Sequence, residues 1–379
     1  MNPSLLLQLP LLIFLPSVFG CYTSIFNFGD SLSDTGNLYY TCSSPHPSQV
    51  CFFPYGETFF HRPTGRFSDG RVVLDFFAIS LGLPLVHPYR SLGLGAEDFR
   101  KGLNFAVGGA TALDLSFFQQ RGIPNLPSTA VSLRNQLQWF KETYSSICAS
   151  SPSMCKDVLK SSLFILGEIG GNDYNYFFLD KRNIEELKPL VPLVLKEIAS
   201  VILELIELGV ETLMVPANIP IGCLPVYVQL YKTTDKDQYD PRNGCLKWLN
   251  QFCEYHNEQL QEELKRIRAF HPHVHLIYAD YFNAAMRIYN APKEFGLIDP
   301  LQVCCVDGNG SYYFPTPCGK PWTSVCDEPS KYVSWDGLHL TEAAYKLMAT
   351  SLLNGSFTTP QFSISCLQQN SSTKLLHLQ

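Results

Sequence analysis

The chain has 379 residues, enough to bury a substantial core, and 46% of them are hydrophobic. Its formal net charge of −6, without clusters of Lys or Arg, argues against nucleic acid or an anionic membrane as a partner. Beyond the first twenty residues no apolar segment approaches the length of a membrane span, so we expect no stable membrane association.

The N-terminus is an apolar leader with its core at residues 5–15. Its three prolines would break a buried helix, whereas the compact residues before Cys21 suit cleavage by signal peptidase. Residues 1–20 are therefore predicted to be a signal peptide. We expect the mature protein to enter the secretory pathway and reach the extracellular space or apoplast, with the vacuole as the alternative compartment.

Strand patterns then alternate with helix patterns along the chain. The 184–208 helix contains Pro189 and Pro192 in its early turns, and Thr341 is the expected N-cap of the last helix. Such alternation predicts a mostly parallel sheet covered by helices on both faces. Without a repeat, a long linker or a break in composition, the chain is predicted to form one domain at 21–360 and a tail at 361–379. The expected elements are strand 24–28, helix 72–81, strand 102–107, helix 131–144, strand 162–166, helix 184–208, strand 212–215, helix 246–270, strand 274–279 and helix 341–353.

Thirteen cysteines, all after residue 20, fit an oxidising compartment. Because the number is odd, at least one has no partner within the chain. Cys148 and Cys155 bracket a loop with Ser and Pro and predict a local disulfide. A second group lacks paired C-x-x-C spacing and indicates disulfides rather than a metal site: Cys304, Cys305, Cys318 and Cys326.

Three sequons, at Asn309, Asn354 and Asn370, are candidate glycosylation sites in a secreted chain. Each of them could equally be unoccupied.

Polar residues crowd the exit of the first predicted strand. This strand ends at Gly-Asp-Ser, which presents the hydroxyl of Ser31 at the carboxyl edge of a sheet, where α/β proteins build their sites. Near the far end of the chain, Asp336 and His339 supply a carboxylate and an imidazole three residues apart. A serine, a base and an orienting carboxylate are the parts of an acyl-transfer enzyme.

Four sequence blocks in a fixed order carry a resemblance to a known family. They are Gly-Asp-Ser-Leu-Ser-Asp at 29–34, Asn-Phe-Ala-Val-Gly-Gly-Ala at 104–110, Gly-Gly-Asn-Asp at 170–173 and Asp-Gly-Leu-His at 336–339. With these blocks the chain resembles the GDSL esterases and lipases, the plant branch of the SGNH hydrolases. It is most similar in look to the subgroup that includes acetylajmalan esterase and the sinapine-type esterases. Further similar segments extend the resemblance over nearly all of the mature chain, at 53–57, 63–70 and 220–225.

The resemblance implies a three-layer α/β/α sandwich with a flavodoxin-like sheet, the SGNH hydrolase fold. It implies Ser31 as the nucleophile, His339 as the base and Asp336 as the carboxylate that orients the base. It also implies an oxyanion hole made of the backbone N–H groups of Ser31 and Gly109 and the side-chain amide of Asn172. Alignment of the second block favours Gly109, with the preceding glycine as the alternative.

The leading hypothesis is a secreted, monomeric serine esterase that forms an acyl-enzyme on Ser31. Its substrate is expected to be a small-molecule ester, such as an acetyl or aroyl ester of a plant alkaloid or another specialised metabolite. An acyltransferase with the same triad, a lipid-ester lipase and a binding protein with a degenerate site are the alternatives. A classical α/β-hydrolase is excluded, because the chain has no G-x-S-x-G elbow.

Two further groups of polar residues have structural interpretations. Asp30 is expected to accept backbone N–H groups, and Asp34 to cap the helix after the nucleophile. His271, His273 and His275 alternate along a predicted strand, but no carboxylate cluster accompanies them. No metal and no cofactor are therefore expected.

Aromatic residues flank the four blocks and predict either an aromatic-lined pocket or core packing. They are Phe52, Phe53, Tyr55, Phe59, Phe60, Phe117, Phe118, Tyr174, Tyr176, Phe177 and Phe178.

Overall fold

The computed structural model of the chain describes residues 22–91, 95–123, 126, 131–149, 151–312 and 316–363. The predicted signal peptide at 1–20, the sequon at Asn370 and most of the predicted tail lie outside these residues. Among the residues described, no helix combines the length and the apolar character needed to cross a membrane.

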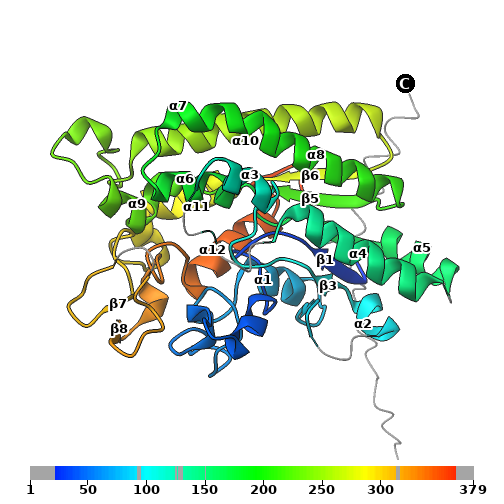
Figure 1. Cartoon of the computed structure of the whole chain (residues 1–379), viewed down its shortest axis with the longest axis horizontal. Helices are drawn as coiled ribbons and strands as arrows, with labels where there is room; N and C mark the ends of the chain where they lie inside the picture. The colour runs from blue at the N-terminus through cyan, green and yellow to red at the C-terminus, as the bar shows by residue number, and fades with distance from the viewer. Residues whose placement is uncertain are drawn as a thin grey trace, which may run out of the picture.

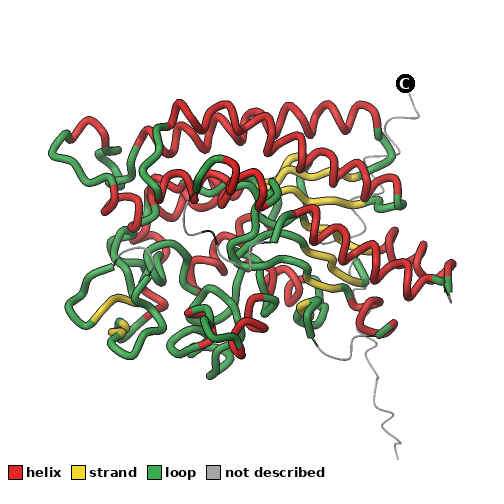
Figure 2. The backbone as a smooth tube through the Cα atoms, in the orientation of Figure 1, coloured by secondary structure: helices red, strands yellow, loops and turns green. Residues whose placement is uncertain are grey.

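A central sheet of seven strands runs through the molecule in the order β2-β3-β1-β4-β5-β6-β9 (Figures 1 and 2). The first six strands are parallel, and β9 pairs antiparallel with β6 at one edge. Its central part, β3-β1-β4-β5-β6, has the flavodoxin-like order that the resemblance implied. The strands are β1 Ser24–Asn27, β2 His87–Pro88, β3 Leu103–Asn104, β4 Ser162–Ile165, β5 Thr212–Pro216, β6 His275–Ala279 and β9 Thr358–Thr359.

Two groups of helices complete a three-layer α/β/α arrangement (Figure 1). In the first group α8 (Val191–Glu207) packs against both α4 (Leu133–Cys148) and α10 (Lys247–Phe270). In the second, α12 (Glu342–Leu353) packs against α1 (Val73–Ser80) and α11 (Tyr281–Asn290). The remaining helices are α2 Ala96–Lys101, α3 Leu115–Gln120, α5 Pro152–Ser161, α6 Gly171–Leu179, α7 Ile184–Leu187 and α9 Pro225–Leu230.

Outside the main sheet, two 3₁₀ turns follow β1, η1 (Leu38–Ser43) and η2 (Gln49–Cys51). A small antiparallel pair, β7 (Cys305–Asp307) and β8 (Thr323–Val325), lies at the end of the molecule where η1 and η2 also lie (Figure 1). The sequence patterns did not predict this pair, nor α6 or α11.

The predicted helix at 184–208 is interrupted. It consists of α7, a 3₁₀ turn at Lys188–Leu190 and α8, because Pro189 and Pro192 each lack the N–H that a continuous helix would use. The expected strand at 102–107 is regular only at Leu103–Asn104, although the N–H groups of Phe105 and Val107 still donate to the carbonyls of Asn27 and Gly29, at 2.7 and 3.1 Å. The last helix begins as predicted, with the Thr341 hydroxyl accepting from the N–H of Ala344 at 3.2 Å.

Aromatic packing fixes the position of β1. Phe26 and Phe28 are fully buried, and Phe140 of α4 contacts both rings edge-on. The side chain of Gln136, one turn earlier on α4, accepts from the N–H of Gly29 and donates to its carbonyl, both at 2.8 Å. Helix α4 thus holds the residue at which the chain leaves the sheet.

Ten cysteines of the described residues form five disulfides, and Cys253 is buried without one. The predicted local disulfide Cys148–Cys155 is present. The four cysteines assigned to disulfides rather than to metal also pair with one another. The bonds besides Cys148–Cys155 are Cys42–Cys51, Cys223–Cys245, Cys304–Cys326 and Cys305–Cys318.

Candidate active site

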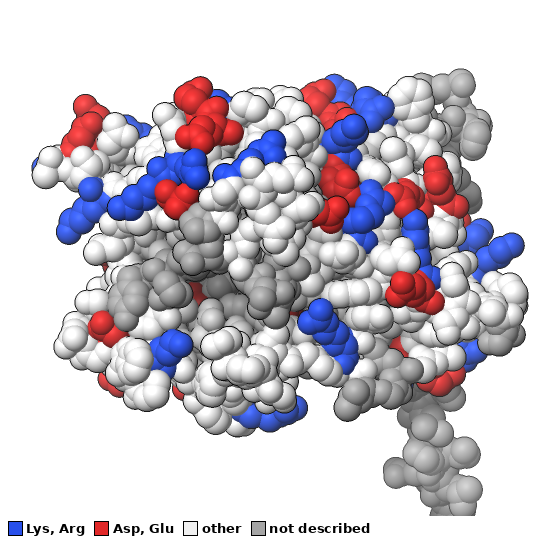
Figure 3. All heavy atoms as spheres, in the orientation of Figure 1, with Lys and Arg blue, Asp and Glu red and all other residues white. Residues whose placement is uncertain are grey.

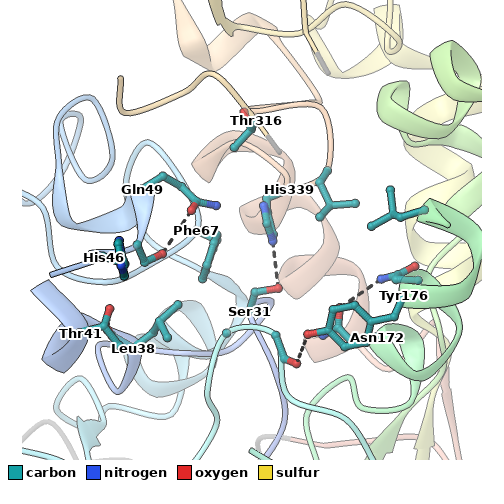
Figure 4. Close-up of a pocket in the computed structure, with 16 residues that line it drawn as sticks. Ser31, Leu38, Thr41, His46, Gln49, Phe67, Asn172, Tyr176, Thr316 and His339 are labelled. Carbon is teal, nitrogen blue, oxygen red and sulfur yellow. Dashed lines mark hydrogen bonds between the residues drawn. The ribbon is translucent and has the colours of Figure 1, made fainter. Parts of the chain in front are cut away.

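A cavity of about 370 Å³ holds Ser31, Gly109, Asn172 and His339 in its wall (Figure 4). Residues far apart in the sequence meet here because parallel strands present their carboxyl ends at one edge of the sheet. The described residues that line the cavity include no Lys, Arg, Asp or Glu. The cavity is thus uncharged apart from what its histidines carry.

Ser31 lies in the turn directly after β1 and is 8% exposed. Before it, Gly29 has φ of +135°, and a Cβ at this position would lie 3.0 Å from the carbonyl oxygen of Glu168. The N–H of Asp30 donates to that same carbonyl at 3.1 Å. A glycine is needed here because the loops after β1 and β4 approach each other this closely.

Ser31, His339 and Asp336 form a connected set. Nε2 of His339 lies 2.9 Å from Oγ of Ser31, and Nδ1 of the same ring lies 2.8 Å from Oδ2 of Asp336. The other carboxylate oxygen of Asp336 accepts from the backbone N–H groups of Leu338 and His339, at 2.9 and 2.7 Å. The short spacing thus places the carboxylate and the imidazole on one turn, immediately before α12.

Tyr55 forms a further hydrogen bond with the carboxylate of Asp336. Its hydroxyl donates to Oδ2 of Asp336 at 2.8 Å, and the side chain is fully buried. Burial by itself would raise the pKa of Asp336, but the His339 ring and the hydrogen bonds to its carboxylate lower that pKa to about 2. Asp336 is therefore a carboxylate throughout the neutral range.

Phe67 holds the imidazole from the side. Its ring centroid is 4.4 Å from that of His339, and it forms part of the cavity wall (Figure 4). The contact leaves little freedom for the ring of His339 to turn away from Ser31.

Backbone donors at the floor of the cavity differ in what they contact. The N–H of Gly108 donates to Oδ2 of Asp34 at 2.9 Å and is therefore engaged. The N–H groups of Ser31 and Gly109 find no acceptor within the part of the chain that the structure describes. Gly109 adopts φ of +82°, and its carbonyl accepts from the hydroxyl of Tyr176 at 2.7 Å. This contrast favours Gly109 over its neighbour as a donor to a bound group.

Asn172 lies in the first turn of α6, and its amide is held within the protein. Its Nδ2 donates to Oδ2 of Asp30 and to the carbonyl of Ala110, both at 3.0 Å. Its Oδ1 accepts from the side chain of Asn175 at 3.2 Å. Both amide hydrogens therefore have protein acceptors, and a bound oxygen would have to share one of them.

Beneath Asn172 lies a buried pair of acids, Asp30 and Glu168. Burial raises the pKa of Glu168 well above its ordinary range, and the charge of Asp30 adds to the effect. This direction favours the protonated form of Glu168, with a hydrogen bond between its side chain and that of Asp30. Its Oε1 also accepts from the N–H of Gly171 at 3.1 Å, which fixes the start of α6.

The two aspartates that flank Ser31 hold loops. Asp30 accepts from the N–H of Leu32 at 2.9 Å, as predicted, and also from Asn172. Asp34 accepts from three successive N–H groups, at residues 36–38, where η1 begins. Because Asp34 also binds the N–H of Gly108, it joins the first and second sequence blocks.

Of the aromatic residues proposed for a pocket, Tyr176 lines the cavity and Tyr55 supports Asp336. Most of the others are buried in the core or lie on the surface. Sequence reasoning missed the role of Tyr55 and did not single out Phe67 or Glu168. The first two lie within segments 53–57 and 63–70, which already carried the family resemblance, whereas Glu168 had no signal besides its place after a predicted strand.

The three histidines of the 271–275 segment do not share one strand face, because β6 begins only at His275. Within the described ranges, no group of three or more His, Cys, Asp or Glu side chains is arranged to hold a metal ion.

Comparison with known proteins identifies relatives over nearly the whole chain. The profile of the GDSL-like lipase/acylhydrolase family matches residues 25–352. One GDSL esterase/lipase of Arabidopsis thaliana is 53% identical over 350 residues, 91% of this chain and 88% of the relative. Another from the same plant is 48% identical over 361 residues, 94% of this chain and 91% of the relative. The sinapine esterase of Brassica napus is 47% identical over 348 residues, 91% of this chain and 89% of the relative.

Proposed function

Since this chain belongs to the GDSL-like lipase/acylhydrolase family, we propose that it hydrolyses a small carboxylic ester through an acyl-enzyme on Ser31. That the protein is a carboxylic ester hydrolase follows from GDSL esterase/lipase relatives that are 53% and 48% identical to it over 91% and 94% of the chain. The single observation that supports Ser31 as nucleophile is the 2.9 Å contact between its Oγ and Nε2 of His339, with Asp336 behind the ring.

In the first half-reaction the Oγ of Ser31 attacks the ester carbonyl carbon while Nε2 of His339 takes the hydroxyl proton. Asp336 accepts from Nδ1–H, which fixes the tautomer and stabilises the imidazolium that forms. Collapse of the tetrahedral intermediate breaks the bond to the alcohol oxygen, which receives the proton from His339. The acyl group is then bonded to Ser31.

The oxyanion of this intermediate would be held by the N–H groups of Ser31 and Gly109, which are supported as donors because no protein acceptor competes for them in the described residues. The amide of Asn172 is the third donor. It would share one hydrogen with the oxyanion, since Asp30 and Ala110 already accept from it.

In the second half-reaction a water attacks the acyl carbon, and His339 takes its proton. The bond to Oγ breaks, the acid leaves, and the proton returns to Ser31. If an alcohol replaced the water, the same steps would give acyl transfer; the products formed with an acceptor alcohol present separate these two outcomes.

The size and lining of the cavity support a small ester. Its volume of about 370 Å³ lies at the lower end of ligand pockets, and no Lys, Arg, Asp or Glu lines it among the described residues. We infer that the reacting part of the substrate is uncharged, such as an acetyl or aroyl ester of a plant specialised metabolite. An alkaloid ester fits if its amine lies outside the cavity. A preference for long acyl chains over acetate would contradict the proposal of a small ester.

Secretion and glycosylation are also part of the proposal. Five disulfides support passage through an oxidising compartment. Asn309 and Asn354 are exposed, as glycosylation requires. Peptide mapping of the secreted protein, with and without enzymatic removal of glycans, would test both sites and the cleavage before Cys21.

The proposed function is tested by hydrolysis of p-nitrophenyl acetate and butyrate by the parent protein and by Ser31→Ala. We expect turnover by the parent and a loss of at least a thousandfold in the folded variant. Equal rates for the two proteins would remove Ser31 as the nucleophile.

A further inference from the structure

Next to the cavity, the surface carries an open groove of about 570 Å³. Phe52, Phe53 and three prolines, Pro45, Pro47 and Pro321, make its apolar walls, and Lys320 is its one charged residue among those described. We call it the Phe52–Phe53 groove. Nothing in the proposed reaction uses it.

The groove adjoins the cavity at one shared residue. His46 lines both, and the residues that follow it in the chain, Ser48 and Gln49, line the cavity. In Figure 4, His46 and Gln49 lie on the opposite side of Ser31 from Asn172. An ester that reacts at Ser31 and extends past His46 would therefore enter the groove.

The groove is built on two braced loops. Disulfide Cys42–Cys51 closes the loop before Phe52, and disulfide Cys305–Cys318 ends just before Gly319 in the opposite wall. The two loops approach each other closely beside the groove, since a Cβ at Gly319 would lie 2.8 Å from the carbonyl oxygen of Gln49. A surface held in this way is formed before any ligand arrives, so binding costs little ordering of the loops.

Its aromatic side chains are unusually exposed. Phe52 is 45% and Phe53 58% exposed, although aromatic rings gain most when they are buried. The part of the surface over η1, η2 and the β7–β8 pair carries few charged side chains (Figure 3). Such a surface favours an apolar partner.

We propose that the Phe52–Phe53 groove is a distal substrate subsite that holds an aromatic ring of the ester, a proposal that rests on the proposed esterase function. An aromatic ring is favoured over a sugar because only His46 and Lys320 offer polar side chains, too few for several hydroxyl groups. Phe52 and Phe53 supply faces for ring stacking, and the ammonium of Lys320 can lie over the face of a bound ring.

The test compares three esters: p-nitrophenyl acetate, p-nitrophenyl 4-phenylbutanoate and 4-phenylbutyl acetate. The last two place a phenyl ring at a distance on the acyl and on the alcohol side. We expect Phe53→Ala and Phe52→Ala to lower kcat/KM for one of these two esters about three- to tenfold, mainly through a higher KM. For p-nitrophenyl acetate, kcat/KM should change less than about twofold in either variant. The ester that responds identifies the side of the substrate that enters the groove.

Phe270→Ala is the matched control, because Phe270 is 73% exposed at the end of α10 and contacts neither cavity nor groove among the described residues. The Phe270→Ala variant should hydrolyse all three esters with the kcat/KM of the parent. Equal kcat/KM values for parent and both groove variants on every ester would overturn the subsite, as would an equal loss on all three.

A binding measurement separates this proposal from the proposed function. Calorimetric titration of the Ser31→Ala variant with 4-phenylbutyl acetate and with 4-phenylbutanol needs no turnover. Addition of Phe53→Ala to that variant should raise Kd about three- to tenfold for at least one ligand. An unchanged Kd for both ligands would contradict the subsite even if Ser31 proves to be the nucleophile.

Discussion

The hydroxyl of Tyr55 donates to the same carboxylate oxygen of Asp336, Oδ2, that lies 2.8 Å from Nδ1 of His339. Each lone-pair region of this carboxylate is thereby engaged, since Oδ1 accepts two backbone N–H groups. These four hydrogen bonds restrict rotation of the carboxylate, and the carboxylate in turn holds the imidazole of His339 in its orientation.

Tyr55→Phe removes this hydrogen bond without changing the packing of the ring. A hydrogen bond to a charged group contributes about 1.5–3 kcal/mol, so we expect kcat to fall about tenfold with little change in KM. Initial rates with p-nitrophenyl acetate measure the effect. Tyr289→Phe is the matched control, because the hydroxyl of Tyr289 is buried without a partner among the described residues; a similar loss in both variants would contradict the role of Tyr55.

Asn172→Ala tests the third oxyanion donor. Removal of such a donor from other enzymes costs about 2.7–4 kcal/mol, and we expect a kcat at least tenfold lower because the amide of Asn172 already has two protein acceptors. KM should change little, since the interaction strengthens only in the transition state. A kcat within threefold of the parent would leave the oxyanion hole to Ser31 and Gly109 alone.

Glu168 is predicted to act as a neutral hydrogen-bond donor to Asp30. Glu168→Gln keeps a neutral donor of similar shape, so its kcat should stay within about threefold of the parent. Glu168→Ala leaves Asp30 buried without that donor, and we expect a loss of about tenfold or more, with lower thermal stability. If the Gln variant were as impaired as the Ala variant, protonation of Glu168 would not be the relevant property.

The buried carboxyl groups of Asp34 and Asp173 should make the free energy of unfolding fall as the pH rises from 5 to 8, by more than the opposing contribution of His256, whose pKa burial lowers to about 3. Burial raises the pKa of Asp173 to about 7 and that of Asp34 to about 6, both above the ordinary value of 3.8. The folded state therefore holds these protons more tightly, and the stabilisation, complete below about pH 4, is lost as the pH passes the raised pKa values.

For Asp173 this loss is on the order of 3 kcal/mol. Urea unfolding at pH 5 and pH 8 should reveal it, and Asp173→Asn should flatten the pH dependence because its side chain stays neutral. Asp237→Asn removes an exposed carboxylate and should unfold like the parent. A parent that is equally stable at both pH values would refute the prediction.

Short-range patterns predicted much of this molecule. The strands that became β1, β4, β5 and β6 are apolar runs, and in a parallel sheet buried on both faces such runs are the expected signal. The turn with Asp336 and His339 was also readable, since its acid and base are close in sequence. Helix α6 was missed because its first turn, with Asn172, has the composition of a loop.

Contacts over long sequence distances could not be read in this way. Tyr55 and Asp336 are 281 residues apart, and Asn172 and Asp30 are 142 apart. A tyrosine in a loop carries no local mark of the carboxylate that it contacts. The protonation of Glu168 likewise depends on burial beside Asp30, which only the assembled loops create.

The acid and the base of this site belong to one short turn, stitched together by its own backbone hydrogen bonds. The positions of the acid and the base relative to each other are consequently set within this turn, and only its contact with Ser31 depends on the distant end of the chain. Ser31 and His339 are 308 positions apart, and insertions in the loops between them that avoid Tyr55 and Phe67 can remodel the walls of the cavity without changing the contacts of the triad. Residues that determine substrate preference can therefore change while the turn that carries the acid and the base stays the same.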